Sequence, residues 1–189
     1  MNLDNWLKLI GIIGGLVAFA VGLWQYRRAQ KWKRLEFVAN EMKEFQSKRV
    51  IQNICWMLDW NEMKIEFHPE EKGGKDRFIN VKDELIKEAL SIKREKFSDE
   101  EIDIRHTFDE FFDCLEQFDH YIISGLVKYS EFHPYLAYWL CILTDKDSGR
   151  KKVSLIKAFE KFIDHFEYHG VQHLLDEYRK CAKKNRTAA

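Results

Sequence analysis

Three histidines near the C-terminus are the first residues whose spacing could do chemistry. His165, His169 and His173 stand four residues apart, and on one uninterrupted helix their imidazoles would share a face and could bind a metal ion. Gly170 interrupts that helix, however, and no carboxylate stands at an obvious ligand spacing on the same face. We therefore expect structural or surface histidines here, and we predict neither a metal site nor a cofactor.

An arginine–histidine pair, Arg105-His106, lies inside a segment rich in phenylalanine. A buried arginine needs a carboxylate partner, because an unpaired buried charge is very costly. Asp103, Asp109 and Asp113 are close in sequence, and a carboxylate from another helix is an equal candidate. The pattern favours a structural ion pair, and the alternative is a polar functional site in the core of the domain.

Basic residues also gather near the end of the chain, in the run from Arg179 to Arg186. Such a run could bind RNA or lipid, although a solvated chain end is the commoner explanation. The sequence contains no phosphate-binding glycine loop, no His-Glu-x-x-His and no nucleophile elbow. There are 31 basic and 31 acidic residues, so the net charge is zero and the whole chain is not an evident nucleic-acid binder.

The element around which the rest of the chain is organised is the apolar segment 6–24, which carries no charge from Leu9 onward. At about 1.5 Å per residue it spans roughly 28 Å, close to the hydrocarbon thickness of a bilayer. Trp6 and Trp24 stand at its two ends, where an indole can occupy the membrane interface. The acidic residue before the segment and the basic residues after it do not fit a cleaved signal peptide. The segment predicts a single transmembrane helix, and a buried core helix is the other alternative.

Small residues form a stripe along this predicted helix. At about 100° per residue, five of them fall within an arc of about 100°, namely Gly11, Gly14, Gly15, Ala18 and Gly22. Small residues let two helix backbones approach closely in a membrane, so we predict that the stripe is the contact surface of a homo-oligomer. The alternative is that glycine is simply commoner in membrane helices than in soluble ones.

Basic residues on the C-terminal side of the apolar segment predict its orientation. Only Lys8 and the amino terminus precede the segment, whereas a basic cluster follows it, with one tryptophan as an interfacial anchor: Arg27, Arg28, Lys31, Trp32, Lys33 and Arg34. Basic flanks stay in the cytoplasm, so we expect residues 1–5 to form a short extracytoplasmic tail and the remainder of the chain to lie inside. The same cluster could contact anionic headgroups.

The rest of the chain predicts one all-α domain of about five or six helices over residues 47–189, preceded by a basic juxtamembrane helix over residues 25–46. Residues 63–80 contain Pro69 and Gly73-Gly74, and we expect a surface loop there with at most a small hairpin. The cysteines are widely spaced, as is typical of buried thiols in a reducing compartment: Cys55, Cys114, Cys141 and Cys181.

Apolar spacing and capping residues predict the positions of these helices. The juxtamembrane helix should bury Leu35, Val38, Met42 and Phe45, and the next helix, from Ser47, should bury Val50, Ile51, Ile54, Cys55 and Leu58. The strongest helix begins at the capping box Ser98–Glu101 and ends near Gly125. Its predicted apolar face consists of Ile102, Arg105, Phe108, Phe112, Leu115, Phe118 and Ile122, with Phe111 beside them. The others are expected over Val81–Lys93, Ser130–Thr144, Val153 to about Gly170, and Val171 to about Lys183.

The layout of the chain resembles a family of small bacterial membrane proteins. The shared features are an outside tail, a membrane helix, the basic junction Tyr26-Arg-Arg-Ala-Gln-Lys-Trp-Lys-Arg34 and a helical domain with Arg105-His106-Thr-Phe-Asp-Glu-Phe-Phe112. One branch of that family comprises the membrane accessory proteins of type VI-B CRISPR systems, whose effectors are RNA-guided RNA-cutting enzymes. The resemblance implies a divergent HEPN-like domain in the bacterial inner membrane, a pore that strengthens antiphage defence, and a CRISPR effector or its RNA products as partners.

HEPN nucleases carry an arginine, then a polar residue, and a histidine four to six residues after the arginine. Arg105-His106 matches the start of that pattern, but positions 109 to 111 are Asp109, Glu110 and Phe111. In such nucleases the histidine is expected to act as the acid–base group on the ribose 2′-hydroxyl, so its absence leaves proton transfer without an obvious residue. The first hypothesis is therefore a non-enzymatic membrane homo-oligomer that forms a regulated pore. The alternatives are a membrane-tethered HEPN-like domain that binds or cleaves RNA, and a membrane scaffold protein.

Overall fold

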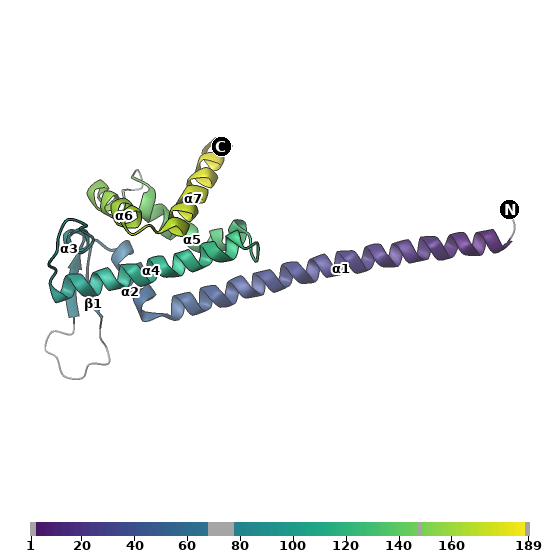
Figure 1. Ribbon diagram of the computed structural model, residues 1–189, viewed down its shortest axis with the longest axis horizontal. Helices are drawn as coiled ribbons and strands as arrows, with labels where there is room; N and C mark the ends of the chain where they lie inside the picture. The colour runs from purple at the N-terminus through teal and green to yellow at the C-terminus, as the bar shows by residue number, and fades with distance from the viewer. Residues whose placement is uncertain (1–2, 68–77, 147–148, 188–189) are drawn as a thin grey trace. The chain divides into compact units, whose positions relative to one another are not determined.

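The computed structural model describes residues 3–67, 78–146 and 149–187, with side chains described from residue 11 to residue 184 within those ranges (Figure 1). The predictions for Pro69, Gly73 and Gly74, and for the side chains of Trp6 and Lys8, lie outside this description, as does the side chain of Arg186. The chain forms two compact units, residues 1–40 and residues 41–189.

Helix α1 runs without interruption from Leu3 to Ser47. The prediction that the helix continues beyond residue 24 through residues 25–46 is confirmed, and this stretch holds neither the glycine nor the proline that would break a helix. Met42 and Phe45 are buried as predicted, but Leu35 is 40% exposed. None of the helices in the described part of the chain combines the length and the apolar character needed to cross a membrane.

The second unit is all-α apart from one small hairpin. In its described part, the end of α1 is followed by six helices: α2 (Arg49–Asp59), α3 (Asp83–Ala89), α4 (Asp99–Ile123), α5 (Tyr129–Thr144), α6 (Val153–His165) and α7 (His169–Thr187). Strands β1 (Glu62–Glu66) and β2 (Phe78–Lys82) pair antiparallel, with Ile65 opposite Ile79. This hairpin agrees with the prediction of at most a small hairpin within residues 63–80.

Helix α4 is the central element of the domain, and it packs against α2, α3 and α7 (Figure 1). Its start and end follow the sequence signals closely. The Glu101 amide donates to Ser98 Oγ at 3.3 Å while Glu101 Oε2 accepts from the Ser98 amide at 2.7 Å, which is the predicted capping box. Gly125 follows the last turn with a φ of +74°, a conformation that glycine adopts without strain.

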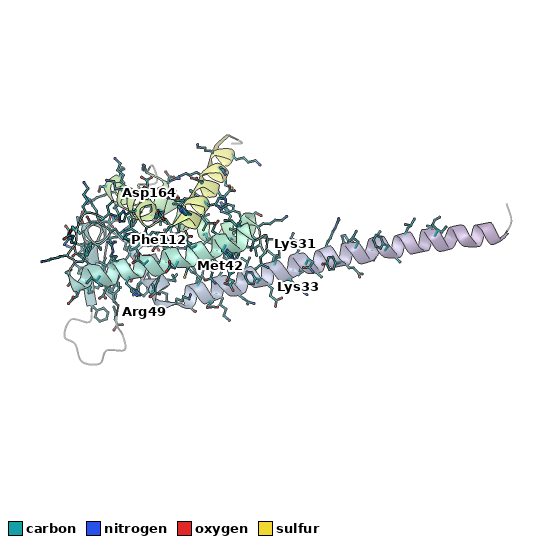
Figure 2. All side chains as sticks on the ribbon, in the orientation of Figure 1. Lys31, Lys33, Met42, Arg49, Phe112 and Asp164 are labelled. Carbon is teal, nitrogen blue, oxygen red and sulfur yellow. The ribbon has the colours of Figure 1, made fainter. Side chains whose placement is uncertain are left out.

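Phenylalanine rings from α1, α4, α5 and α6 pack together within the core, among many buried aliphatic side chains. Phe112 lies inside the bundle (Figure 2), with its ring centroid 6.1 Å from that of Phe162 in α6. The rings of Phe108 and Phe159 are 5.4 Å apart, and Phe45 of α1 meets Phe118 edge to face at 5.2 Å. Offset and edge-to-face pairs of this kind add to the burial of apolar surface, which explains why so aromatic a sequence suits a helical bundle.

Several sequence predictions about local structure were wrong in part. Helix α6 ends at His165 rather than near Gly170, and α7 already begins at His169. Val81 and Lys82 belong to β2 rather than to the next helix, because their backbone pairs with β1. Helix α3 also ends at Ala89 rather than at Lys93, so it is only 7 residues long. In α4 Phe111 is buried beside the stripe as expected, but the buried face also includes Ile104, which the prediction did not name, and Ile102 is 50% exposed. In α2 the buried face includes Met57 and Asn53, and it leaves Val50 and Cys55 partly exposed. In the two helices, apolar residues occur on more than one face, so spacing alone did not fix the buried one.

A buried ion pair fixes the start of α3 relative to the start of α6. Lys151 Nζ lies 2.7 Å from Asp83 Oδ1, and their side chains are 0% and 5% exposed. The same ammonium donates to the Trp60 carbonyl at 2.7 Å. Asp83 is the first residue of α3, and Lys151 lies two residues before α6. The pair therefore ties together two helices and the turn after α2.

Candidate functional site

The predicted oligomerisation stripe lies on a part of α1 that nothing else in its own unit covers. Added Cβ atoms at Gly11, Gly14, Gly15 and Gly22 would meet no atom within 4 Å, and Ala18 is exposed. The bulky residues on the other faces are also exposed, with values of 62% for Ile12, 64% for Leu16 and 70% for Phe19, for example. The helix thus presents apolar side chains all round over residues 11–24.

The predicted interfacial residues follow on the same helix. Arg27, Arg28, Lys31 and Lys33 are exposed, and Arg34 is half-buried. The Arg28 guanidinium lies over the Trp24 ring, 5.5 Å from its centroid, so a cation and an indole share one short stretch of the helix. Trp32 is 65% exposed.

Arg105 does not form the predicted ion pair. Within the described part of the chain, its Nη1 donates to the Ala89 carbonyl at 2.9 Å and to the Ser91 carbonyl at 3.5 Å. Its guanidinium also lies 4.9 to 5.1 Å from the ring centroids of three phenylalanines, which are Phe97, Phe162 and Phe166. Carbonyls at the C-terminal end of α3 carry partial negative charge, and aromatic faces attract cations. These groups stabilise the arginine in place of a carboxylate.

His106 and Asp109, the neighbours of Arg105 on α4, make separate contacts. His106 is exposed, with Nδ1 3.2 Å from Glu110 Oε1 in an i,i+4 pair. Burial raises the pKa of the Asp109 carboxyl, although the hydrogen bond from Tyr168 and the charge of Arg105 oppose this rise. Asp109 stands at a position where the HEPN pattern expects a histidine. Tyr168 Oη donates to Asp109 Oδ1 at 3.1 Å, and this hydrogen bond joins α4 to the residue before α7.

The three histidines are not brought together as ligands. His165 ends α6, His169 begins α7, and His173 Nδ1 lies 2.6 Å from Oδ1 of the buried Asp119 in α4. No group of three potential metal ligands occurs among the residues that the structure describes. Helices α4 and α7 approach each other so closely at Gly170 that an added Cβ would lie 2.9 Å from Asp119 Cβ. His173 and Asp119 therefore fasten α7 to α4.

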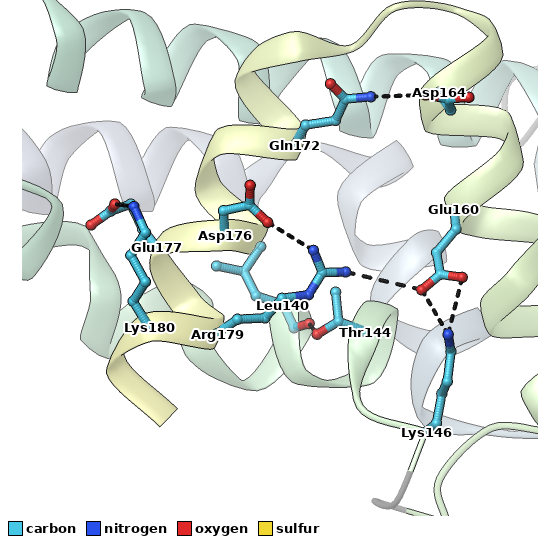
Figure 3. Close-up of polar contacts among 10 residues, drawn as sticks. All are labelled: Leu140, Thr144, Lys146, Glu160, Asp164, Gln172, Asp176, Glu177, Arg179 and Lys180. Carbon is cyan, nitrogen blue, oxygen red and sulfur yellow. Dashed lines mark hydrogen bonds and ion pairs between the residues drawn. The ribbon is translucent and has the colours of Figure 1, made fainter. Parts of the chain in front are cut away.

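Most of the basic tail is engaged within the domain. Figure 3 shows Arg179 between Asp176 and Glu160, with Nη1 2.8 Å from Asp176 Oδ1 and Nη2 4.0 Å from Glu160 Oε1. Glu160 also pairs with Lys146 at 3.1 Å, and Lys180 with Glu177 at 2.7 Å. Lys183 and Lys184 have partners as well. Arg179 and Lys180 are thus paired with acidic side chains of the domain, while their own side chains remain 44% and 70% exposed.

The four cysteines are free thiols and half-buried rather than fully buried. Burial raises the pKa of the Cys55 thiol to about 12, with a further contribution from the charge of Asp59. Burial likewise raises the pKa of Cys114. Thiols with raised pKa react slowly because the thiolate is the nucleophile, so Cys55 and Cys114 suit packing.

A basic pocket of about 350 Å³ lies between α3 and α6, and the sequence analysis did not identify it. Its basic lining consists of Lys87, Lys93, Lys157, Lys161 and His165. One signal was available in the sequence. Lys157, Lys161 and His165 recur every four residues, which places three basic side chains in a row on one face of a helix. The other wall, from the end of α3, depends on tertiary structure.

Comparisons of the chain with protein-family models, with curated proteins and with solved structures returned no match. The class that the structure establishes is therefore an all-α domain carrying a long N-terminal helix. The resemblance to the CRISPR accessory proteins and the HEPN-like character of the domain remain predictions.

Proposed function

We propose that this protein is a membrane-anchored homo-oligomer that acts as a regulated pore. In this proposal residues 6–24 of α1 span the inner membrane of a bacterium, residues 1–5 lie outside, and the helical domain lies in the cytoplasm. No helix in the described part of the chain is by itself long and apolar enough to cross a membrane, but the proposed span also includes residues 6–10, whose side chains lie outside that description. The observation on which this proposal depends is the exposure of apolar side chains all round α1 over residues 11–24. The uncharged stretch begins at Leu9, two residues before the first described side chain.

The energetic argument concerns what covers these side chains. Burying one Leu, Ile or Phe side chain away from water stabilises a protein by about 1.5–3 kcal/mol, and α1 exposes Ile12, Leu16 and Phe19 together on one short stretch. Lipid supplies that burial for the bulky faces. Lipid gains nothing from a glycine face, whereas a second helix can pack closely against it. The two faces thus favour a bilayer on one side and a neighbouring copy on the other.

The basic cluster after the apolar segment supports the orientation. Arg27, Arg28, Lys31 and Lys33 are exposed and could reach the headgroups of the inner leaflet. Closed cyclic symmetry is the usual outcome when identical chains associate, and a ring of α1 helices has a central axis. The lining of such an axis is almost wholly apolar, so the pore gates by dewetting. By the family resemblance, opening would depolarise the membrane when an RNA-guided effector is activated.

A pair of adjacent substitutions tests this proposal. Gly15→Leu fills the stripe and raises hydrophobicity, so the helix still inserts while its close packing is lost. Leu16→Ala changes a bulky residue outside the stripe and serves as the control. We expect Gly15→Leu alone to lose the oligomer on a sizing column and to lose membrane depolarisation in cells with an activated effector. If both variants remain oligomeric and active, the stripe is not the interface.

The second hypothesis, a membrane-tethered HEPN-like domain that cleaves RNA, has less support. The donors of Arg105 are directed at the carbonyls of Ala89 and Ser91, and Asp109 occupies a position where the acid–base histidine would be expected. A scaffold role without a pore is distinguished by the depolarisation assay, since a scaffold would remain oligomeric without changing the membrane potential.

A further inference from the structure

The pocket between α3 and α6 gathers four lysines around one hollow. Many of the lysines elsewhere in the domain are paired with carboxylates, as Lys146 is with Glu160 and Lys180 with Glu177. In contrast, the four lysines of the pocket make no ion pair or hydrogen bond with any residue that the structure describes. The acidic side chain in the lining, Asp164, accepts a hydrogen bond from Gln172 at 3.4 Å.

The spacing of these cations has a cost in the unliganded protein. Lys157 and Lys161 are four residues apart on α6, and like charges at that spacing destabilise a helix. Lys87 and Lys93 face the same hollow from α3 and the segment after it. An anion bound among the four ammonium groups would relieve this repulsion and would accept hydrogen bonds from ammonium groups that pair with no carboxylate among the described residues.

The remainder of the lining is apolar or carries hydroxyl groups. Leu90, Ile92 and Ala158 supply the apolar part, and Ser91 and Ser154 supply the hydroxyls. A volume of about 350 Å³ is at the lower end of the range of pockets that hold small molecules. A lone inorganic ion would leave the apolar part uncovered, whereas a small molecule with an anionic group and a flat or apolar body would use both.

We propose that this pocket binds a small phosphate-bearing ligand, with the phosphate held by Lys157, Lys161, Lys87 and Lys93 and the body of the ligand against Leu90, Ile92 and Ala158. The phosphate can belong to a soluble molecule of nucleotide size or to a lipid headgroup. Arg105 anchors one wall of the pocket, because it donates to the Ser91 carbonyl at 3.5 Å. The proposal is independent of the pore, since it concerns the helical domain alone.

The experiment measures the reactivity of individual lysines. The full-length protein in neutral detergent is acetylated briefly, and the modification of each lysine is quantified by mass spectrometry. The probes are adenosine monophosphate, adenosine without phosphate, inorganic phosphate, and vesicles of phosphatidylcholine with or without phosphatidylglycerol. Lys43 and Lys64, which are exposed and lie outside the pocket, are internal controls.

We expect adenosine monophosphate to protect the four pocket lysines and not the two controls, with weaker protection by inorganic phosphate and none by adenosine. Protection by phosphatidylglycerol vesicles alone would also support the phosphate site and would assign the phosphate to a lipid headgroup. Equal protection by adenosine and its monophosphate, or no protection by any probe, would overturn the proposal. Protection that extends equally to Lys43 and Lys64 would indicate non-specific charge binding and would also overturn it.

A double variant provides the second measurement. Lys157→Gln/Lys161→Gln removes two charges from the pocket, and Lys43→Gln/Lys64→Gln removes the same charge elsewhere. All four side chains are exposed, so both variants should fold, as circular dichroism will check. We expect the pocket variant to weaken binding of the protecting probe by at least about tenfold, and the control to leave it within about twofold. Equal weakening in both variants would contradict the assignment.

Discussion

Of the substitutions predicted here that remove one charge, Lys151→Met should destabilise the domain most. The substitution keeps most of the aliphatic volume but removes the ammonium group. It leaves the Asp83 carboxylate, 5% exposed, without its cation, and it leaves the Trp60 carbonyl without its donor at 2.7 Å. An uncompensated buried charge of this kind costs about 3–5 kcal/mol.

That cost translates into a measurable melting temperature. In a protein of this size each kcal/mol shifts Tm by about 2–4 °C, so Lys151→Met should lower Tm by roughly 6–20 °C. The assay is thermal unfolding followed by far-ultraviolet circular dichroism in neutral detergent. Asp83→Asn combined with Lys151→Met should recover part of the loss, because the double variant leaves no unpaired charge in the interior.

The neighbouring pair Lys152–Glu84 is a matched control. It joins the same two segments at 2.6 Å, but its side chains are 67% and 65% exposed. Water already solvates both groups, so Lys152→Met should leave Tm close to that of the wild type. If Lys151→Met shifted Tm no more than Lys152→Met, burial would not be what makes the Lys151–Asp83 pair important.

Four further predictions concern the domain and its location. Gly170→Ala should lower stability by about 1–3 kcal/mol, because its Cβ would lie 2.9 Å from Asp119 Cβ, and an unchanged Tm would contradict the close contact of α4 with α7. The hydrogen bond from Arg94, and after it that from the Ser98 amide, lowers the pKa of the Glu101 carboxyl. The ionised carboxylate therefore stabilises the folded state at pH values above the ordinary pKa of a glutamate. This stabilisation is lost as the pH falls through the lowered pKa. Glu101→Gln should therefore be less stable than the wild type at neutral pH, and the gap should close in acid; a gap independent of pH would refute this. A cysteine introduced by Lys96→Cys should react with a membrane-impermeant reagent only after cells are permeabilised, and labelling of intact cells would reverse the proposed topology. Purified protein should not cleave single-stranded RNA without metal, and cleavage that is abolished by Arg105→Ala would show a nuclease site.

Features governed by neighbouring residues were predictable from the sequence. The capping box at Ser98, the left-handed glycine at Gly125 and the continuity of α1 through residues 25–46 depend on residues within a few positions of one another. The breakers within residues 63–80 correctly limited that region to a small hairpin. The end of the hairpin was placed too early, since Val81 and Lys82 read equally well as the start of a helix.

Features that join distant residues were not predictable in the same way. The expected partner of Arg105 was a carboxylate, but the structure uses carbonyls at the end of α3 and three aromatic rings, and no local pattern indicates that choice. Lys151 and Asp83 are brought together by folding alone. The lysine row on α6 was visible in the sequence, but only the packing of α3 against α6 turns it into a pocket.

The mass of the wild-type particle tests the central proposal most directly. Full-length protein is extracted from membranes with a neutral detergent, and its protein mass is measured by sedimentation with correction for bound detergent. The proposal of a closed homo-oligomer predicts one species whose protein mass is a whole-number multiple, larger than one, of 22.7 kDa. A single species of 22.7 kDa across the accessible concentrations would contradict it, because a monomer has no helix ring and no pore.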